Sequence, residues 1–136
     1  MTDAYLPPFA AWKNISKVVD EDSNLYVKFE YEAFIRSIKM MLCSVKIDEA
    51  FYLATYPDVA DAIKSGVYRD AAHHFVANGY FEGRLPFKIA VDEKWYLKEN
   101  PDVKAGIKDG KLESVEKHFN DHGYGEGRLP SNIAFE

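Results

Sequence analysis

The sequence of this 136-residue chain is poor in cysteine and in long apolar runs. Its single cysteine, Cys43, excludes an internal disulfide. Because Cys43 lies in the apolar run MMLCSV, we expect it to be a small core residue in a reducing compartment. No basic segment followed by an apolar run opens the chain, and no stretch is long enough to span a bilayer. These absences predict a cytoplasmic protein without membrane insertion.

Positive charge and catalytic motifs are also scarce. The 22 acidic residues outnumber the 17 basic ones, and the net charge is −5. This balance disfavours phosphate backbones and anionic membranes as partners, so we expect no nucleic acid. The chain has no GxSxG elbow, phosphate-binding glycine loop, HExxH or CxxC. We therefore predict a protein that is not an enzyme and needs no cofactor, with an active site assembled from scattered residues as the alternative.

What the sequence does contain is an internal repeat. Residues 47–90 align without a gap onto residues 91–134, with 21 identities in 44 positions. Self-similarity at a fixed period is typical of architectures in which one supersecondary unit is copied and stacked. We expect an N-terminal helical segment (1–46), repeat 1 (47–90) and repeat 2 (91–134), forming one compact domain overall.

Each copy of the repeat predicts three short helices. In the first copy, acids at Asp48 and Glu49 favour the positive end of a helix. Pro57 stops that helix and suits the first position of a second one, which ends at Gly66. A third helix is expected over residues 70–78. The same signals recur 44 residues later in the second copy.

The first 46 residues also show helical spacing. Apolar positions predict a short helix over residues 9–19 and a longer one over residues 25–44, with a solvated loop at residues 20–24. The alternation in LYVKFEY would also suit a strand, but no second strand candidate is evident to pair with it. The predicted fold is therefore all-α: N-terminal helices followed by two stacked copies of a 44-residue three-helix repeat, as a short helical solenoid.

The repeated pattern YLxxxPDVxxxIKxG, followed by HFxxxGYxEGRLP, resembles a short tandem repeat of bacterial proteins. Those proteins act in surface-polysaccharide biosynthesis, and the repeat is often appended to glycosyltransferases. The likeness covers residues 47–130. In such proteins the repeat accompanies the catalytic domain and does not contain it, so the resemblance implies an accessory role.

The repeated arginines Arg84 and Arg128 are candidate binding residues. As ligands they would hold a carboxylate or phosphate through two hydrogen bonds each. As structural residues they would donate to helix-end carbonyls or to an acid such as Asp58 or Asp102, with the neighbouring glycine permitting the turn. We favour the structural interpretation, because a repeat joint must be built twice and a ligand site seldom is.

Repeated histidines are the second candidates. His74 and His118 occupy equivalent positions, and His118 with His122 has the spacing that can bind a metal from one helix face. The other copy has Asn78 in place of His122, and no acidic or cysteine cluster completes a site. We therefore expect no metal, and expect each repeated histidine to hydrogen-bond a neighbouring segment.

Aromatic side chains are the third candidates. Trp95 and Tyr96 would provide sugar-stacking platforms if their rings were exposed, whereas rings at helical spacing beside Leu and Val are more often core. If both rings are buried, this role as a platform fails.

The predicted function is a non-catalytic protein-interaction or accessory module linked to bacterial surface-polysaccharide synthesis. The alternative is a carbohydrate or sugar-nucleotide binding domain, with a glycan as ligand. Residues 132–136 restart the repeat and then stop, which predicts a homodimer, another homo-oligomer or docking on a larger protein. Functional residues are expected in the N-terminal helices, which are not repeated, and where the copies differ, as at Phe51/Trp95, His73/Lys117, Asn78/His122 and Phe81/Gly125.

Overall fold

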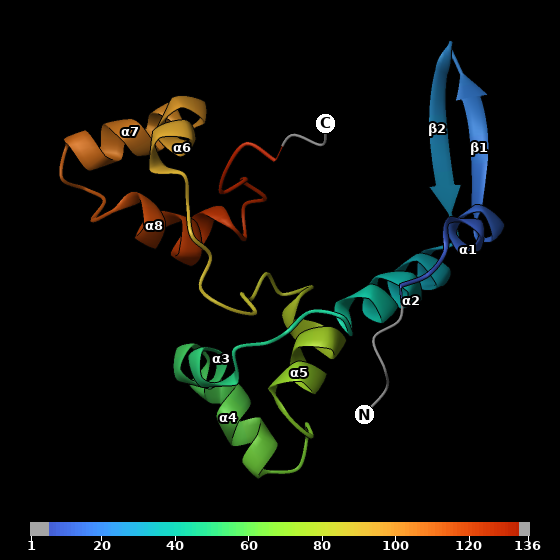
Figure 1. Cartoon of the computed structure of the whole chain (residues 1–136), viewed down its shortest axis with the longest axis horizontal. Coiled ribbons are helices and arrows are strands. Elements are labelled where there is room, and N and C mark those ends of the chain that lie inside the picture. The colour runs from blue at the N-terminus through green and yellow to red at the C-terminus, as the bar shows by residue number, and fades with distance from the viewer. Residues whose placement is uncertain (1–5, 134–136) are drawn as a thin grey trace. The chain divides into compact units, whose positions relative to one another are not determined.

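The structure is a computed structural model that describes residues 6–133 (Figure 1). The described chain forms two compact units that divide between Lys46 and Ile47, where the first repeat begins. The restarted repeat expected at residues 132–136 lies mostly outside the described residues.

The N-terminal unit combines helices with a β-hairpin. Its elements are α1 (Phe9–Asn14), β1 (Ser16–Glu21), β2 (Asn24–Phe29) and α2 (Tyr31–Leu42). The two strands are antiparallel, with Val18 opposite Val27 and Glu21 opposite Asn24. The expectation of an all-α fold is therefore wrong: the chain is mostly helical but contains a two-stranded sheet.

The error has a specific cause. Residues 16–19 of β1 fall within the first predicted helix, which in fact ends at Asn14, and residues 20 and 21 fall within the predicted loop. The expected loop is the hairpin turn, in which Asp22 and Ser23 have φ of 54° and 64°. Positive φ at both central residues is what a two-residue hairpin turn of type I′ requires. The helix predicted over residues 25–44 therefore begins later than expected. Residues 25–29 belong to β2, and Glu30 is the N-cap of α2.

Packing in the N-terminal unit centres on three rings. Trp12 meets Phe29 edge to face at 6.1 Å between centroids, and Phe29 meets Phe34 at 5.1 Å. Among residues 6–46, only Pro7 and Leu42 are buried. Cys43 is exposed, so the expectation that it is a core residue is wrong, because α2 ends just before it.

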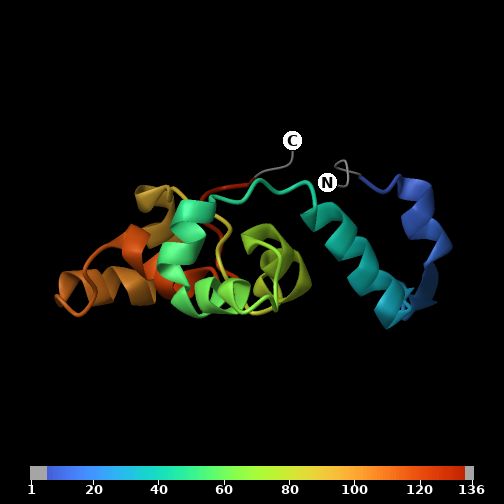
Figure 2. The same ribbon diagram turned by 90° about the horizontal axis from the view of Figure 1, so that it is seen from below.

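Each repeat contains three helical segments, the third continuing as a π-helical turn (Figures 1 and 2). In repeat 1 these are α3 (Glu49–Thr55), α4 (Pro57–Lys64), α5 (Ala71–His74) and η1 (Phe75–Gly79). In repeat 2 they are α6 (Glu93–Glu99), α7 (Pro101–Lys108), α8 (Val115–His118) and η2 (Phe119–Gly123).

Local signals explain where these helices begin and end. The carboxylate of Asp48 accepts a hydrogen bond from the backbone N–H of Phe51 at 3.0 Å, and Asp92 does the same for Trp95. Such caps satisfy N–H groups that have no partner within the helix. Proline opens α4 and α7, and Gly66 ends α4 with a φ of 77°.

Each repeat has its own small core. The buried apolar residues are Tyr52, Val59, Ala71, Phe75 and Leu85 in repeat 1, and Tyr96, Val103, Val115 and Phe119 in repeat 2. Asn120 joins the repeats: its side-chain amide accepts from the Ile89 backbone N–H at 3.2 Å and donates to the Ile89 carbonyl at 3.3 Å.

Within residues 6–133, every helix is too short or too polar to cross a membrane.

Candidate functional site

The two repeated arginines lie in equivalent ion-pair networks. Arg84 donates from Nη1 and Nη2 to the two carboxylate oxygens of Asp58, at 3.0 and 2.8 Å, and from Nε to Glu82 at 2.7 Å. Arg128 makes the same three contacts with Asp102 and Glu126. The joint considered for these arginines from the sequence is thus present in both repeats, and both guanidinium groups are occupied by the chain's own acids.

The two networks differ in one additional contact. In repeat 1 the guanidinium lies 5.0 Å from the centre of the Tyr56 ring, within the range of a cation–π interaction. In repeat 2 the residue at this position is Asn100, whose side-chain oxygen accepts a hydrogen bond from Arg128 at 2.9 Å. The copies therefore keep the ion pair and replace the ring by an amide.

Electrostatics in the networks follow from these contacts. The hydrogen bonds from Arg128 lower the pKa of Asp102 to about 2, and those from Arg84 lower the pKa of Asp58. The same pairs raise the pKa of both arginines. At neutral pH Asp58 and Asp102 are therefore charged, and both oxygens of each carboxylate accept hydrogen bonds from an arginine.

The repeated histidines are held inside their own repeats. His74 Nδ1 is hydrogen-bonded to the Tyr52 hydroxyl at 2.9 Å, and His118 Nδ1 to the Tyr96 hydroxyl at 3.2 Å. Burial, together with the nearby arginine, lowers the pKa of both imidazoles, and burial raises the pKa of both phenols. Both members of each pair are therefore neutral at pH 7; the hydrogen bond is buried in repeat 1 and partly buried in repeat 2.

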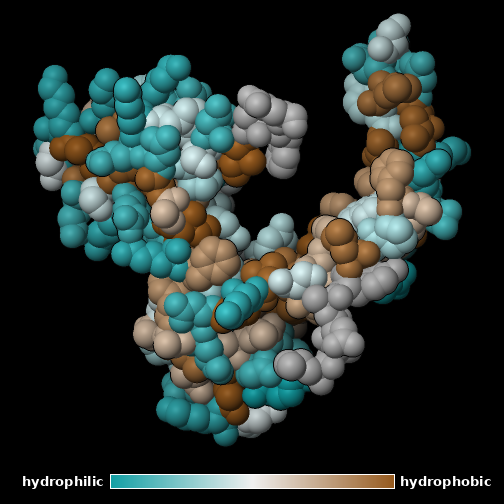
Figure 3. Space-filling model, in the orientation of Figure 1, coloured by the Kyte–Doolittle hydropathy of each residue, from teal (hydrophilic) through white to brown (hydrophobic). Residues whose placement is uncertain are grey.

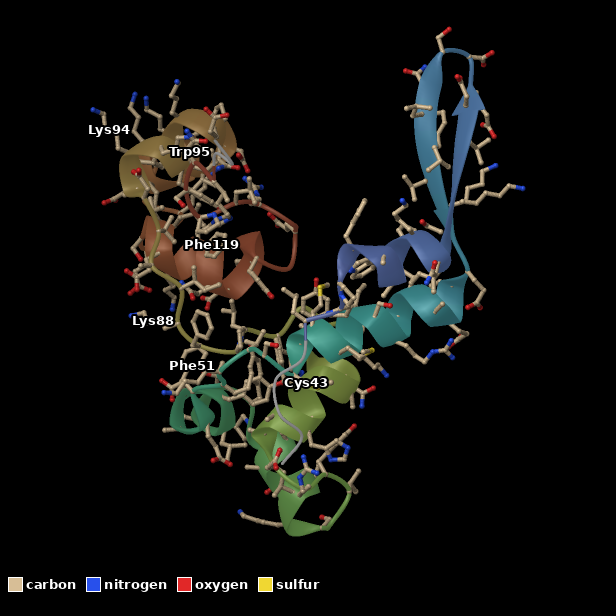
Figure 4. The ribbon with its side chains drawn as sticks, turned by 45° about the vertical axis from the view of Figure 1, so that its right-hand side comes forward. Cys43, Phe51, Lys88, Lys94, Trp95 and Phe119 are labelled. Atoms are coloured by element: carbon tan, nitrogen blue, oxygen red, sulfur yellow. The ribbon has the colours of Figure 1, made fainter. Side chains whose placement is uncertain are left out.

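The aromatic candidates have different environments. Tyr96 is fully buried, so it cannot stack on a sugar. Trp95 is half-buried and packs against the core of repeat 2 (Figure 4). Only one of the two rings therefore retains any exposed surface.

Metal ligation has no cluster to support it. The rings of His118 and His122 lie 5.9 Å apart, centroid to centroid, with His118 engaged by Tyr96. Among residues 6–133, no three or more His, Cys, Asp or Glu side chains lie close enough together to hold a metal ion.

A cavity between the two repeats brings together residues that the sequence did not connect. It has a volume of about 600 Å³, within the usual range for small-molecule sites. Its lining comes from α3, from the segment that joins the repeats and from the start of α8 (Figure 4). The lining residues are Phe51, Thr55, Leu85, Lys88, Val91, Glu93, Ser114, Val115, Glu116, Lys117, Asn120 and Asp121.

Except for Glu93, the charged residues that line this cavity form ion pairs. Lys88 contacts Glu116 at 2.8 Å, and Lys117 lies 3.3 Å from Glu113 and 3.9 Å from Asp121. A half-buried phenyl ring, Phe51, completes the lining. Paired charges beside a ring favour a neutral polar ligand over a strongly anionic one.

The sequence contained one signal for this cavity. Phe51 and Lys117 are both positions at which the two copies differ, and such differences were expected to mark functional residues. The cavity itself could not be predicted, because it depends on how repeat 1 packs against repeat 2.

No family model, curated protein or solved structure matches this chain.

Proposed function

We propose that this protein is a non-catalytic interaction module in the bacterial cytoplasm that serves as an accessory to surface-polysaccharide synthesis. The observation that carries the interaction role is the distribution of exposed apolar side chains. Large hydrophobic residues of the hairpin and of the start of α2 are exposed: Val18, Leu25, Tyr26, Val27, Phe29 and Tyr31. Of these, Val18, Leu25, Val27 and Phe29 share one face of the hairpin, and contiguous exposed apolar surface is typical of protein contact sites.

The polar residues support the same proposal. Both repeated arginines and both repeated histidines are engaged within their own repeats, so they stabilise the scaffold and leave no converging set of reactive groups. The link to polysaccharide synthesis comes from the resemblance of the repeated pattern alone.

Affinity capture tests this function. The full chain, tagged and expressed in the bacterium that encodes it, should recover a glycosyltransferase or a polysaccharide-export protein identified by mass spectrometry. An unrelated helical protein of similar net charge is the control bait. Recovery of neither class of protein, or a gene neighbourhood of regulators or toxins, would contradict the proposal.

Binding of a neutral glycan is the second candidate function, and the inter-repeat cavity favours it. Phe51 would stack on a sugar face, and the carboxylates of the lining would bind hydroxyls. Saturation-transfer NMR with maltoheptaose and with UDP-glucose would test both ligand classes, using Phe51→Ala as the variant and Phe81→Ala, outside the cavity lining, as the control. Absence of transfer to either ligand would eliminate this candidate.

A further inference from the structure

The hairpin has one edge to which a further strand can pair. Residue pairs in an antiparallel ladder alternate between hydrogen-bonded and non-hydrogen-bonded. Glu21 and Asn24 flank the two-residue turn and so form a hydrogen-bonded pair. The backbone N–H and C=O groups of Leu25, Val27 and Phe29 therefore point away from β1. Within residues 6–133 the sheet has only these two strands, so the outward groups of β2 meet no strand.

One face of the hairpin carries four exposed apolar side chains, together with Asp20 opposite Leu25 and Ser16 opposite Phe29. Leu25 and Val27 are 74% and 54% exposed, Phe29 is 37% exposed, and Val18, opposite Val27, is 63% exposed. Figure 3 shows hydrophobic residues along the hairpin. The other face carries Tyr26 and Lys28. An exposed edge strand with an apolar face is a template for pairing with another chain.

The two edges of the hairpin are not equally protected. Natural proteins place charged residues on edge strands to prevent pairing. β1 has three charged residues among six, Lys17, Asp20 and Glu21, whereas β2 has only Lys28. All six residues of β2 are exposed, whereas Ser16 and Val19 of β1 are half-buried. The open edge is therefore that of β2.

We propose that β2 pairs edge to edge with β2 of a second copy of this chain, antiparallel, about a two-fold axis at Val27. A two-fold axis normal to the sheet keeps each face on its own side, and opposed residues of antiparallel strands point to the same face. The axis must therefore lie midway between one residue and the same residue of the second copy. Centring on Tyr26 would extend the pairing to Ser23, whose φ of 64° belongs to the turn. Centring on Val27 extends it to Glu30, whose backbone is already extended, with φ −70° and ψ 128°.

The side chains in this register are complementary. Leu25 lies opposite the partner's Phe29, and Val27 lies opposite its own copy, which makes the apolar faces continuous. On the other face Tyr26 lies opposite the partner's Lys28, an arrangement that suits a cation and a ring. No two like charges are opposed. The strand thus matches itself along its length, which an unrelated strand would do only by coincidence.

The packing of the N-terminal unit also favours a second copy. Among residues 6–46 only Pro7 and Leu42 are buried, and an isolated two-stranded hairpin is marginally stable. Edge pairing converts it into a four-stranded sheet of order β1-β2-β2-β1, which is large enough to persist. This inference rests on the proposed interaction function and names one partner for it.

Disulfide cross-linking of the full chain tests the register. With Cys43→Ser as background, Val27→Cys places two thiols on directly opposed residues, whose Cα atoms are about 5.5 Å apart in such a pair and within disulfide reach. Val18→Cys is the matched control, since it lies on the same face but three strand spacings, about 14 Å, from its copy. Mild oxidation should give a covalent dimer with Val27→Cys and not with Val18→Cys. A covalent dimer of Val18→Cys alone would indicate pairing through β1, and covalent dimers of both variants would indicate face-to-face packing. If neither variant gave a covalent dimer, the strands would not pair. Each of these three results overturns the proposal.

Proline substitution provides a second measurement. Val27→Pro removes an outward N–H without breaking the ladder to β1, a position at which edge strands accept proline. Light scattering should give twice the 15.5 kDa chain mass for the parent and for the control Val18→Pro, and the single mass for Val27→Pro. A parent that is monomeric up to submillimolar concentration would overturn the inference. If a monomeric parent still captured polysaccharide-synthesis proteins, the proposed function would stand and the dimer would not. If the parent were a β2-paired dimer that captured no such protein, the dimer would stand and the proposed function would not.

Discussion

Arg84 binds both carboxylate oxygens of Asp58, at 3.0 and 2.8 Å, across 26 residues of chain. The contact joins the turn that closes repeat 1 to the first turn of α4. Because planar, bidentate pairs fix direction as well as distance, it orients the closing turn against the helix. The same contact recurs in repeat 2, which indicates that the EGR turn is a structural joint of each copy.

Replacing this arginine should weaken repeat 1. In Arg84→Ala the ion pair and the contact with Tyr56 are lost, and we expect the free energy of unfolding to fall by about 1 to 2 kcal/mol. The lower part of that range is favoured, because water can solvate the Asp58 carboxylate once Arg84 is removed. The Asp58 side chain is 64% exposed, whereas that of Arg84 is 22% exposed. Urea denaturation measures the change. The control Lys64→Ala removes a wholly exposed pair with Asp61 and should change little. Equal stability of Arg84→Ala and the parent would favour a ligand role for the arginine.

Glycine 79 should tolerate no side chain. A Cβ at this position would overlap the Tyr52 hydroxyl and crowd the His74 ring, so Gly79→Ala must displace a buried hydrogen bond. We expect a loss of about 1 to 3 kcal/mol in urea denaturation, the usual range for overpacking a core. The control is Gly125→Ala, whose Cβ would make an ordinary contact of 3.6 Å and should change stability by less than about 0.5 kcal/mol. A neutral Gly79→Ala would show that the hydrogen bond is not fixed.

The helices of the repeats could be predicted from sequence because their signals are local. Asp48 caps α3, Pro57 opens α4 and Gly66 ends it, and each signal acts within one turn of the residue that carries it. The bidentate pair of Arg84 with Asp58 could also be anticipated, because the sequence repeats both residues at the same spacing.

The hairpin and the cavity could not be predicted in this way. β1 is short and its valines at positions 18 and 19 also fit helical spacing, so only its pairing with β2 distinguishes the two structures. The cavity depends on contacts between residues of different repeats, such as Asn120 and Ile89, which no local pattern specifies.

Stability should fall as the pH is lowered below 7. Burial keeps the pKa of His74 and His118 below 6.5 in the folded chain, so the unfolded chain binds more protons as the pH falls through that value. Stability therefore rises with pH across this window and is lost on acidification. Urea denaturation between pH 5 and pH 7.5 should show this slope, and His74→Gln should reduce it. His118→Gln should reduce it likewise. A pH-independent parent would mean that neither buried imidazole resists protonation.

The hairpin turn provides a prediction for the N-terminal unit. Ser23 has a φ of 64°, and the left-handed region costs a residue with a Cβ about 1 to 2 kcal/mol, whereas glycine enters it freely. Glycine loses more conformational entropy than serine on folding, and this cost offsets part of the gain. We therefore expect Ser23→Gly to stabilise the hairpin by about 0.5 to 1 kcal/mol. Trp12 contacts Phe29 of β2, so its fluorescence during urea denaturation reports on this unit once Trp95 is replaced by phenylalanine. The control Ser37→Gly places glycine inside α2 and should destabilise the unit by about 0.5 kcal/mol. If Ser23→Gly lowered stability as Ser37→Gly does, the turn would not hold a left-handed residue and the register of β1 with β2 would have to be revised.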